Sequence, residues 1–227
     1  MAFDKQAIKD KSRRILDPVV AILASTGASP MLVSVVGLVI SLYAAILITR
    51  GSLFWAGFWL LISGVCDILD GALARERGQE TKFGAFVDST FDRISELFVF
   101  GALLLYYKGQ GYSETLLVII LVAMAGSVLV SYARARIEGL GETCTVGLLE
   151  RPERLVLLIV GLLLGRHFLV FVLTLIAFGT VITVLQRIHH AHEVLSGPPG
   201  PPPSMEEREE PAPQTPAPAD EEPPPAT

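Results

Sequence analysis

The chain has 227 residues, 51% of them hydrophobic and 18% charged, and its mean hydropathy is +0.53. Its apolar residues come in long uncharged blocks, which indicates a protein that crosses a membrane several times. The two cysteines, Cys66 and Cys144, show no C-x-x-C spacing and exclude a disulfide-stapled scaffold. The net charge of −5 comes from residues 196–227, which hold seven acids and one base and leave a body of about +1.

Residues 1–30 predict an N-terminal amphipathic helix that lies in the membrane interface. Basic residues precede a short apolar run at 19–23, and Pro18 stands between them as a kink or a break. The alternative is a plain cytosolic leader. The basic residues are Lys5, Lys9, Lys11, Arg13 and Arg14.

Residues 31–195 predict a domain of six transmembrane helices, so the expected fold is an all-α integral membrane protein. Pro30 suits the first turn of a helix capped by Ser29, and no charge follows until Arg50. The charges of the second and third spans gather where the two spans meet. The spans cover 31–49, 53–73, 82–107, 114–136, 152–165 and 168–185.

The basic residues predict the orientation of this bundle. With six spans, only Arg50, Lys108 and Arg166 of the eighteen Lys and Arg lie on the side opposite the termini. The positive-inside rule therefore places both termini, and the charges between spans two and three, on the cytoplasmic side of the plasma (inner) membrane.

Residues 196–227 predict a disordered cytosolic tail. Twelve of the fifteen prolines lie beyond position 197, and acids and alanines fill much of the remainder. Such a segment has too little apolar area to offset the entropy of ordering it. A proline-rich ligand for a partner protein is the alternative role.

Four acids interrupt the apolar sequence between spans two and three. Asp67 and Asp70 are spaced i, i+3 and Asp88 and Asp92 are spaced i, i+4, so each pair shares one helix face. A short connection could aim all four carboxylates at one point. Oxygen ligands favour Mg²⁺, Mn²⁺ or Ca²⁺ over zinc, so the pattern predicts a metal site. Surface ion pairs with neighbouring basic residues are the alternative.

Small residues beside these acids predict a binding site for a diphosphate. Gly71 and Gly84 lack side chains and Ala74 has a small one, which allows a ligand to approach the backbone closely. Arg75 adds a guanidinium suited to phosphate oxygens.

The spacing D-x2-D-G-x2-A-R-x8-G-x3-D-x3-D, from Asp67 to Asp92, resembles the signature of the CDP-alcohol phosphatidyltransferases. The resemblance implies a homodimeric enzyme that uses Mg²⁺ or Mn²⁺ and transfers a phosphatidyl group from CDP-diacylglycerol or a related CDP-lipid, releasing CMP. It also implies that Asp92 is the general base. The implied metal ligands are Asp67, Asp70, Asp88 and Asp92, and the implied CDP-binding residues are Gly71, Ala74, Arg75, Thr81 and Gly84.

A second cluster of charges lies on the same side of the membrane. The segments S-Y-x-x-A-R, from Ser131, and E-R-P-E-R-L, from Glu150, resemble the prokaryotic phosphatidylinositol phosphate synthase branch, in which lysine is expected at Arg134. That branch transfers to inositol phosphate. The alternative is that the arginines anchor the chain to lipid headgroups. The implied ligands of the acceptor phosphate are Ser131, Arg134, Arg136, Arg154 and Arg187.

Two other functions fit parts of the pattern. Glycerol 3-phosphate as acceptor would give a phosphatidylglycerophosphate synthase with the same chemistry. A divalent-cation transporter would also place acids in membrane helices, but it should carry polar residues near the midplane of several spans. The acids instead gather at one end of two spans, which favours the enzyme.

Overall fold

The computed structural model describes residues 27–196, which form six helices and no strand. The predicted interfacial helix and the predicted disordered tail lie outside the described residues. The all-α prediction is confirmed for the part of the chain that is described. The helices are α2 (Pro30–Thr49), α3 (Leu53–Glu76), α4 (Lys82–Gly109), α5 (Glu114–Glu138), α6 (Arg151–Leu164) and α7 (Arg166–Leu195).

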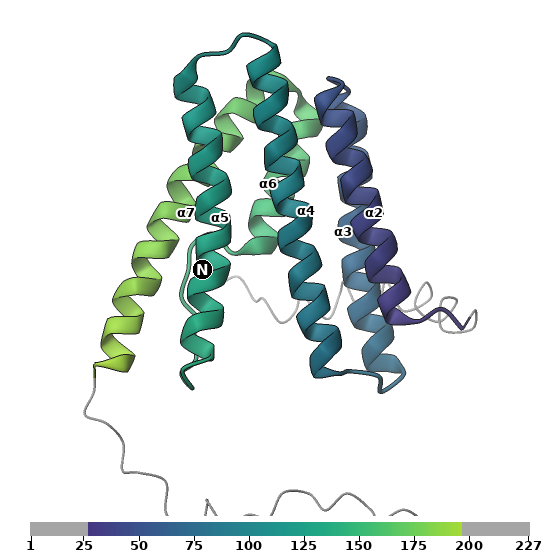
Figure 1. The fold of residues 1–227 in the computed structure, drawn as a ribbon, viewed down its shortest axis with the longest axis vertical. Coiled ribbons are helices and arrows are strands. Elements are labelled where there is room, and N and C mark those ends of the chain that lie inside the picture. Colours follow the sequence, from purple (N-terminus) through teal and green to yellow (C-terminus); the bar gives the residue numbers. More distant parts are fainter. Residues whose placement is uncertain (1–26, 197–227) are drawn as a thin grey trace, which may run out of the picture.

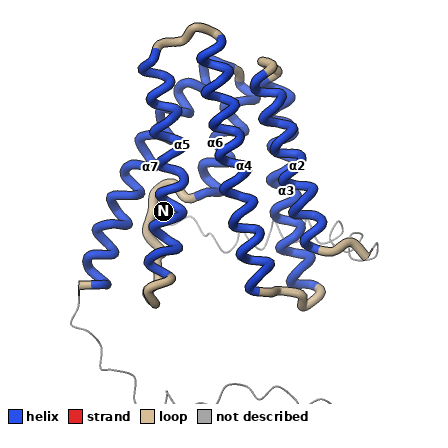
Figure 2. The backbone as a smooth tube through the Cα atoms, viewed as in Figure 1, coloured by secondary structure: helices blue, strands red, loops and turns tan. Residues whose placement is uncertain are grey.

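The six helices run up and down, and successive connections lie at alternate ends of the bundle (Figure 1). Their main contacts close into a ring in which the order is α2, α3, α6, α7, α5, α4 and back to α2. Helix α2 therefore lies between α3 and α4, although α3 and α4 follow each other in sequence. Figure 2 shows the short turn that joins α3 to α4 at the lower end of the bundle.

Four of the described helices, α2, α3, α5 and α7, are long and apolar enough to cross a membrane. Their outer faces carry exposed apolar side chains, such as Val39 and Phe178, which suits contact with lipid. Helix α6 has only 14 residues, and the first half of α4 carries several charges. The protein is thus a membrane protein, and the spans expected at α4 and α6 stay predictions.

Several helices extend beyond the predicted spans. Helix α7 continues to Leu195 and so has 30 residues, about 45 Å at 1.5 Å per residue, although the apolar block ends near 185. Hydropathy marks only the part of a helix that suits lipid, because polar residues remain helical where the helix leaves the apolar layer.

Two caps and one turn position the acidic helices. Ser29 accepts a hydrogen bond from the Leu32 amide at the start of α2, and Thr81 accepts one from the Gly84 amide at the start of α4. Gly78 takes a φ of +61° in the turn between α3 and α4, a conformation that favours glycine. The turn lets α3 and α4 run antiparallel, with their acidic ends at the same end of the bundle.

Small residues allow close packing between helices. Gly126 of α5 faces Thr180 of α7, where an added Cβ atom would lie 2.3 Å from the threonine Oγ1. Gly37 of α2 faces Cys66 of α3 in the same way, at 3.2 Å from the cysteine Cβ. The contact at Gly126 leaves no room for a side chain and the one at Gly37 is tight, so glycine at these positions lets the helices approach closely.

Candidate active site

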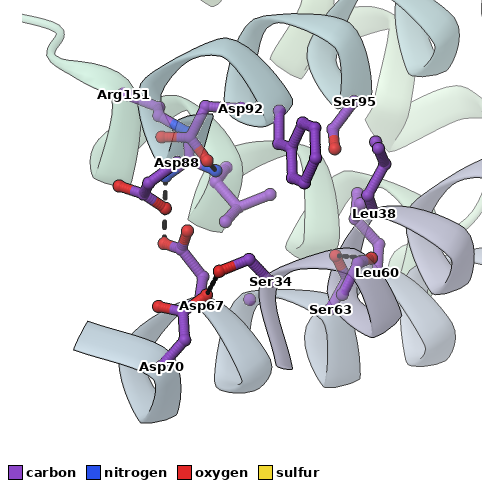
Figure 3. Close-up of a pocket in the computed structure, with 14 residues that line it drawn as sticks. Ser34, Leu38, Leu60, Ser63, Asp67, Asp70, Asp88, Asp92, Ser95 and Arg151 are labelled. Carbon is purple, nitrogen blue, oxygen red and sulfur yellow. Dashed lines mark hydrogen bonds and ion pairs between the residues drawn. The ribbon is translucent and has the colours of Figure 1, made fainter. Parts of the chain in front are cut away.

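Three carboxylates from two helices converge near the lower part of the bundle. Asp67 lies on α3, and Asp88 and Asp92 lie one turn apart on α4. One oxygen from each lies within 4.8 Å of the others. Figure 3 shows the three side chains pointing toward one another across the space between the helices. An all-oxygen donor set of this kind fits Mg²⁺ or Mn²⁺.

The fourth predicted ligand, Asp70, lies in the same cavity but outside this group of three. It is buried, and its Oδ2 accepts a hydrogen bond from the Ser34 hydroxyl of α2 at 2.6 Å (Figure 3). Sequence reasoning missed Ser34, because a single serine in an apolar helix gives no spacing signal. The hydrogen bond orients Asp70, so Ser34 is a supporting residue of the site.

Arg151, the first residue of α6, contacts two of the three converging acids. Its Nη1 lies 3.0 Å from Asp67 Oδ2, and its Nη2 contacts Asp92 Oδ1. Figure 3 shows Arg151 beside Asp92. Sequence reasoning did not assign this arginine to the acids, because 84 residues separate it from Asp67.

The carboxylates line a cavity of about 30 Å³ between α2, α3, α4 and α6. Ser63 and Ser95 line this cavity: the Ser63 hydroxyl donates to the Gly37 carbonyl at 2.8 Å, and the Ser95 Oγ lies 2.8 Å from the Ser41 Oγ. A water molecule needs at least about 10–15 Å³ of such space, so the cavity has room for ions and water.

The predicted CDP-binding residues lie near the turn between α3 and α4. The Arg75 guanidinium folds back over Gly71, where an added Cβ atom would lie 3.5 Å from Nη1. The Thr81 hydroxyl already accepts the Gly84 amide at 2.9 Å, so Thr81 caps α4. Ala74 lies one residue before Arg75 on α3. These residues therefore lie along the ends of α3 and α4 that meet at this turn, and their roles stay predictions.

Arg154, predicted to bind the acceptor phosphate, is fully buried with an exposed fraction of 0%. Its Nε and Nη2 donate to Glu96 at 2.7 and 3.0 Å, and its Nη1 donates to the Leu149 carbonyl at 3.2 Å. A guanidinium held by a bidentate carboxylate and a carbonyl is fixed in orientation. The pair also ties α4 to α6.

The other predicted acceptor residues lie around the loop between α5 and α6. Arg187 of α7 is buried and donates to the carbonyls of Val146, at 3.0 Å, and Val130. Arg134 is exposed and pairs with Glu138 at 2.8 Å. Ser131 and Arg136 lie on the same last turns of α5, with Arg136 exposed.

Glu150, which the sequence prediction did not assign, bridges two of these arginines. Its Oε1 lies 3.5 Å from Arg187 Nη2 and 4.0 Å from Arg134 Nη1. The predicted set is thus split. Arg187 and Arg134 share one acidic neighbour, whereas Arg154 is held by Glu96.

Sequence comparisons agree with this site. The profile of the family described as CDP-alcohol phosphatidyltransferase matches residues 28–185. The phosphatidylinositol phosphate synthase of Mycobacteroides abscessus is 36% identical over 183 residues, covering 78% of this chain and 83% of the relative. That of Streptomyces avermitilis is 34% identical over 187 residues, covering 77% of each.

Solved structures of Mycobacterium tuberculosis phosphatidylinositol phosphate synthase share the fold. The one with CDP-DAG bound has a TM-score of 0.74 and 34% identity, covering 79% of this chain and 94% of that chain. The complex with manganese and citrate has a TM-score of 0.71 and 34% identity, covering 76% and 86%. The resemblance read from the signature is therefore confirmed, and the chain belongs to the CDP-alcohol phosphatidyltransferases, a family of transferase enzymes.

Proposed function

We propose that this protein transfers the phosphatidyl group of CDP-diacylglycerol to inositol phosphate and releases CMP, with Mg²⁺ or Mn²⁺ as cofactor. The observation that carries the proposal is the convergence of Asp67, Asp88 and Asp92 within 4.8 Å. Support comes from relatives named phosphatidylinositol phosphate synthase, one of them solved with CDP-DAG and one with manganese.

The acidic residues divide into ligands and a base. Asp67, Asp70 and Asp88 would hold the divalent cations with a contribution from Asp92. A bound cation supplies charge neutralisation for the diphosphate and for the leaving phosphate. Asp92 takes the proton of the acceptor hydroxyl, whose oxygen attacks the β-phosphorus. A P–O bond forms to the acceptor, the P–O bond to CMP breaks, and CMP leaves with the electron pair.

The substrates would bind on either side of the acids. The CDP moiety would bind near the turn between α3 and α4, where it would be held by Gly71, Ala74, Arg75, Thr81 and Gly84. The acceptor phosphate would meet the arginines at the lower ends of α5 and α7, among which Arg134 and Arg136 are exposed. The predicted acceptor ligands are Ser131, Arg134, Arg136, Arg154 and Arg187.

The membrane arrangement follows from the same proposal. All six helices would cross the plasma (inner) membrane, with an interfacial helix before them. The acids and both termini would face the cytoplasm, because most basic residues lie at that end. We also expect a homodimer, on the family resemblance, which crosslinking in membranes can test.

The test of the reaction is CMP release by purified protein given CDP-diacylglycerol and a panel of acceptors. We expect release with inositol phosphate, little with glycerol 3-phosphate, and none with inositol. Asp92→Asn should lower release by a factor of 10² or more, the range of general-base catalysis. Glu114→Gln, which also replaces a carboxylate with an amide but lies at the opposite end of the bundle, is the control. Preference for glycerol 3-phosphate would reject inositol phosphate as the acceptor, and full activity of Asp92→Asn would reject Asp92 as the general base.

A further inference from the structure

The first turn of α6 carries two adjacent and opposite charges, Glu150 and Arg151, and each contacts a different half of the site. Arg151 contacts Asp67 and Asp92 among the converging acids. Glu150, the N-cap residue, lies 3.5 Å from Arg187 Nη2 at the other side. These two adjacent residues thus place a positive charge beside the converging acids and a negative charge beside an arginine predicted to bind the acceptor phosphate.

Arg151 contacts two of the carboxylates that a metal would need. Asp67 and Asp92 belong to the group of three acids whose oxygens lie within 4.8 Å of one another. A guanidinium has only hydrogen-bond donors, so it occupies carboxylate lone pairs that a metal ion would otherwise coordinate. Its positive charge also repels a divalent cation bound at the same carboxylates. Arg151 and a divalent cation therefore compete for the same two carboxylates, those of Asp67 and Asp92.

Arg151 is held less firmly than its neighbour Arg154. The Arg154 side chain is fully buried and is fixed by two hydrogen bonds to Glu96 and one to a backbone carbonyl. The Arg151 side chain is 29% exposed and makes one contact with each of two acids on different helices. The Glu150 side chain is 34% exposed. Both side chains are therefore partly exposed and can move into solvent, but Arg187, the partner of Glu150, is buried and needs another anion in its place.

We propose that Glu150 and Arg151 form an internal ligand pair that a divalent cation and an acceptor phosphate displace together. The phosphate half of this inference rests on the proposed function. Because both residues belong to one helical turn, moving Arg151 off the acids also loosens Glu150 from the arginines. Metal and phosphate should therefore each strengthen the binding of the other, since coupling between two sites is reciprocal.

The test measures Mn²⁺ binding by electron paramagnetic resonance on purified full-length protein without CDP-lipid. Arg151→Gln should bind Mn²⁺ about tenfold more tightly, the factor expected for removing two partly exposed competing ion pairs. Inorganic phosphate should tighten Mn²⁺ binding a few-fold in the wild type, after correction for Mn²⁺–phosphate in protein-free samples. Glu150→Gln and Arg151→Gln should both lose that coupling.

Arg50→Gln, the same charge change at the end of α2 away from the acids, is the matched control and should leave Mn²⁺ binding unchanged. Thermal unfolding adds a second readout: Arg151→Gln should be less stable than wild type with EDTA but equal to it with saturating Mn²⁺. If Arg151 had a purely structural role, its replacement would lower the stability both with EDTA and with saturating Mn²⁺. Unchanged or weaker Mn²⁺ binding in Arg151→Gln would overturn the proposal. Failure of CMP release alone would reject the transferase and leave these binding shifts intact.

Discussion

Replacing Arg154 with methionine should destabilise the protein strongly, because it removes one partner of a buried ion pair. The arginine is 0% exposed and Glu96 is 11% exposed, and their two hydrogen bonds measure 2.7 and 3.0 Å. Removing one partner of such a pair costs about 3–5 kcal/mol, because the remaining charge stays buried. At about 2–4 °C per kcal/mol for a chain of this size, Tm should fall by roughly 6–20 °C.

Replacing both partners separates this effect from any role in acceptor binding. Arg154→Met combined with Glu96→Met keeps similar volume without a stranded charge, so it should recover most of the lost Tm. The assay is thermal unfolding in detergent, followed by the fluorescence of Trp55 and Trp59. Arg134→Met, at a side chain that is 47% exposed, is the control and should shift stability by less than about 0.5 kcal/mol. A double variant as unstable as the single one would refute the reasoning.

Three further outcomes follow from the packing and the site. Gly126→Ala should lower the free energy of unfolding by about 1–3 kcal/mol, because the added Cβ would collide with Thr180. Gly101→Ala, where the added Cβ meets no atom within 4 Å, is the control and should not destabilise the protein when both are unfolded in detergent. Ser34→Ala should raise the Kd for Mn²⁺ about 10-fold or more, because Asp70 loses the hydrogen bond that orients it. A titration followed by electron paramagnetic resonance measures this Kd, and an unchanged value would contradict the role of Ser34. EDTA should abolish CMP release and added Mn²⁺ should restore it; activity that survives exhaustive chelation would contradict a metal requirement.

The acidic core of the site could be predicted because helical spacing is regular. Residues three or four apart on a helix share a face, and a short turn brings two such faces together, so the convergence of Asp67, Asp88 and Asp92 follows from the sequence. The hydrogen bond from Ser34 to Asp70 does not follow, because it depends on how α2 packs against α3. Spacing along one helix carries no information about that contact.

The roles of the arginines were the hardest part to predict. A buried ion pair and a phosphate site both use arginine, so the sequence alone cannot distinguish Arg154, held by Glu96, from the more exposed Arg134. Arg151 reaches the acids only because α6 begins beside α4, and that placement is set by tertiary packing. The helix count agreed with the structure for the described residues, whereas helix ends differed because hydropathy follows lipid and not hydrogen bonding.

The position of α2 between α3 and α4 makes an apolar helix the spacer of a charged site. As the ribosome delivers the chain, α2 precedes both acidic helices, which must then assemble on either side of it. The helices that carry the acids therefore depend on α2 for their relative placement, and at Gly37 the missing side chain lets α2 approach Cys66 of α3 closely.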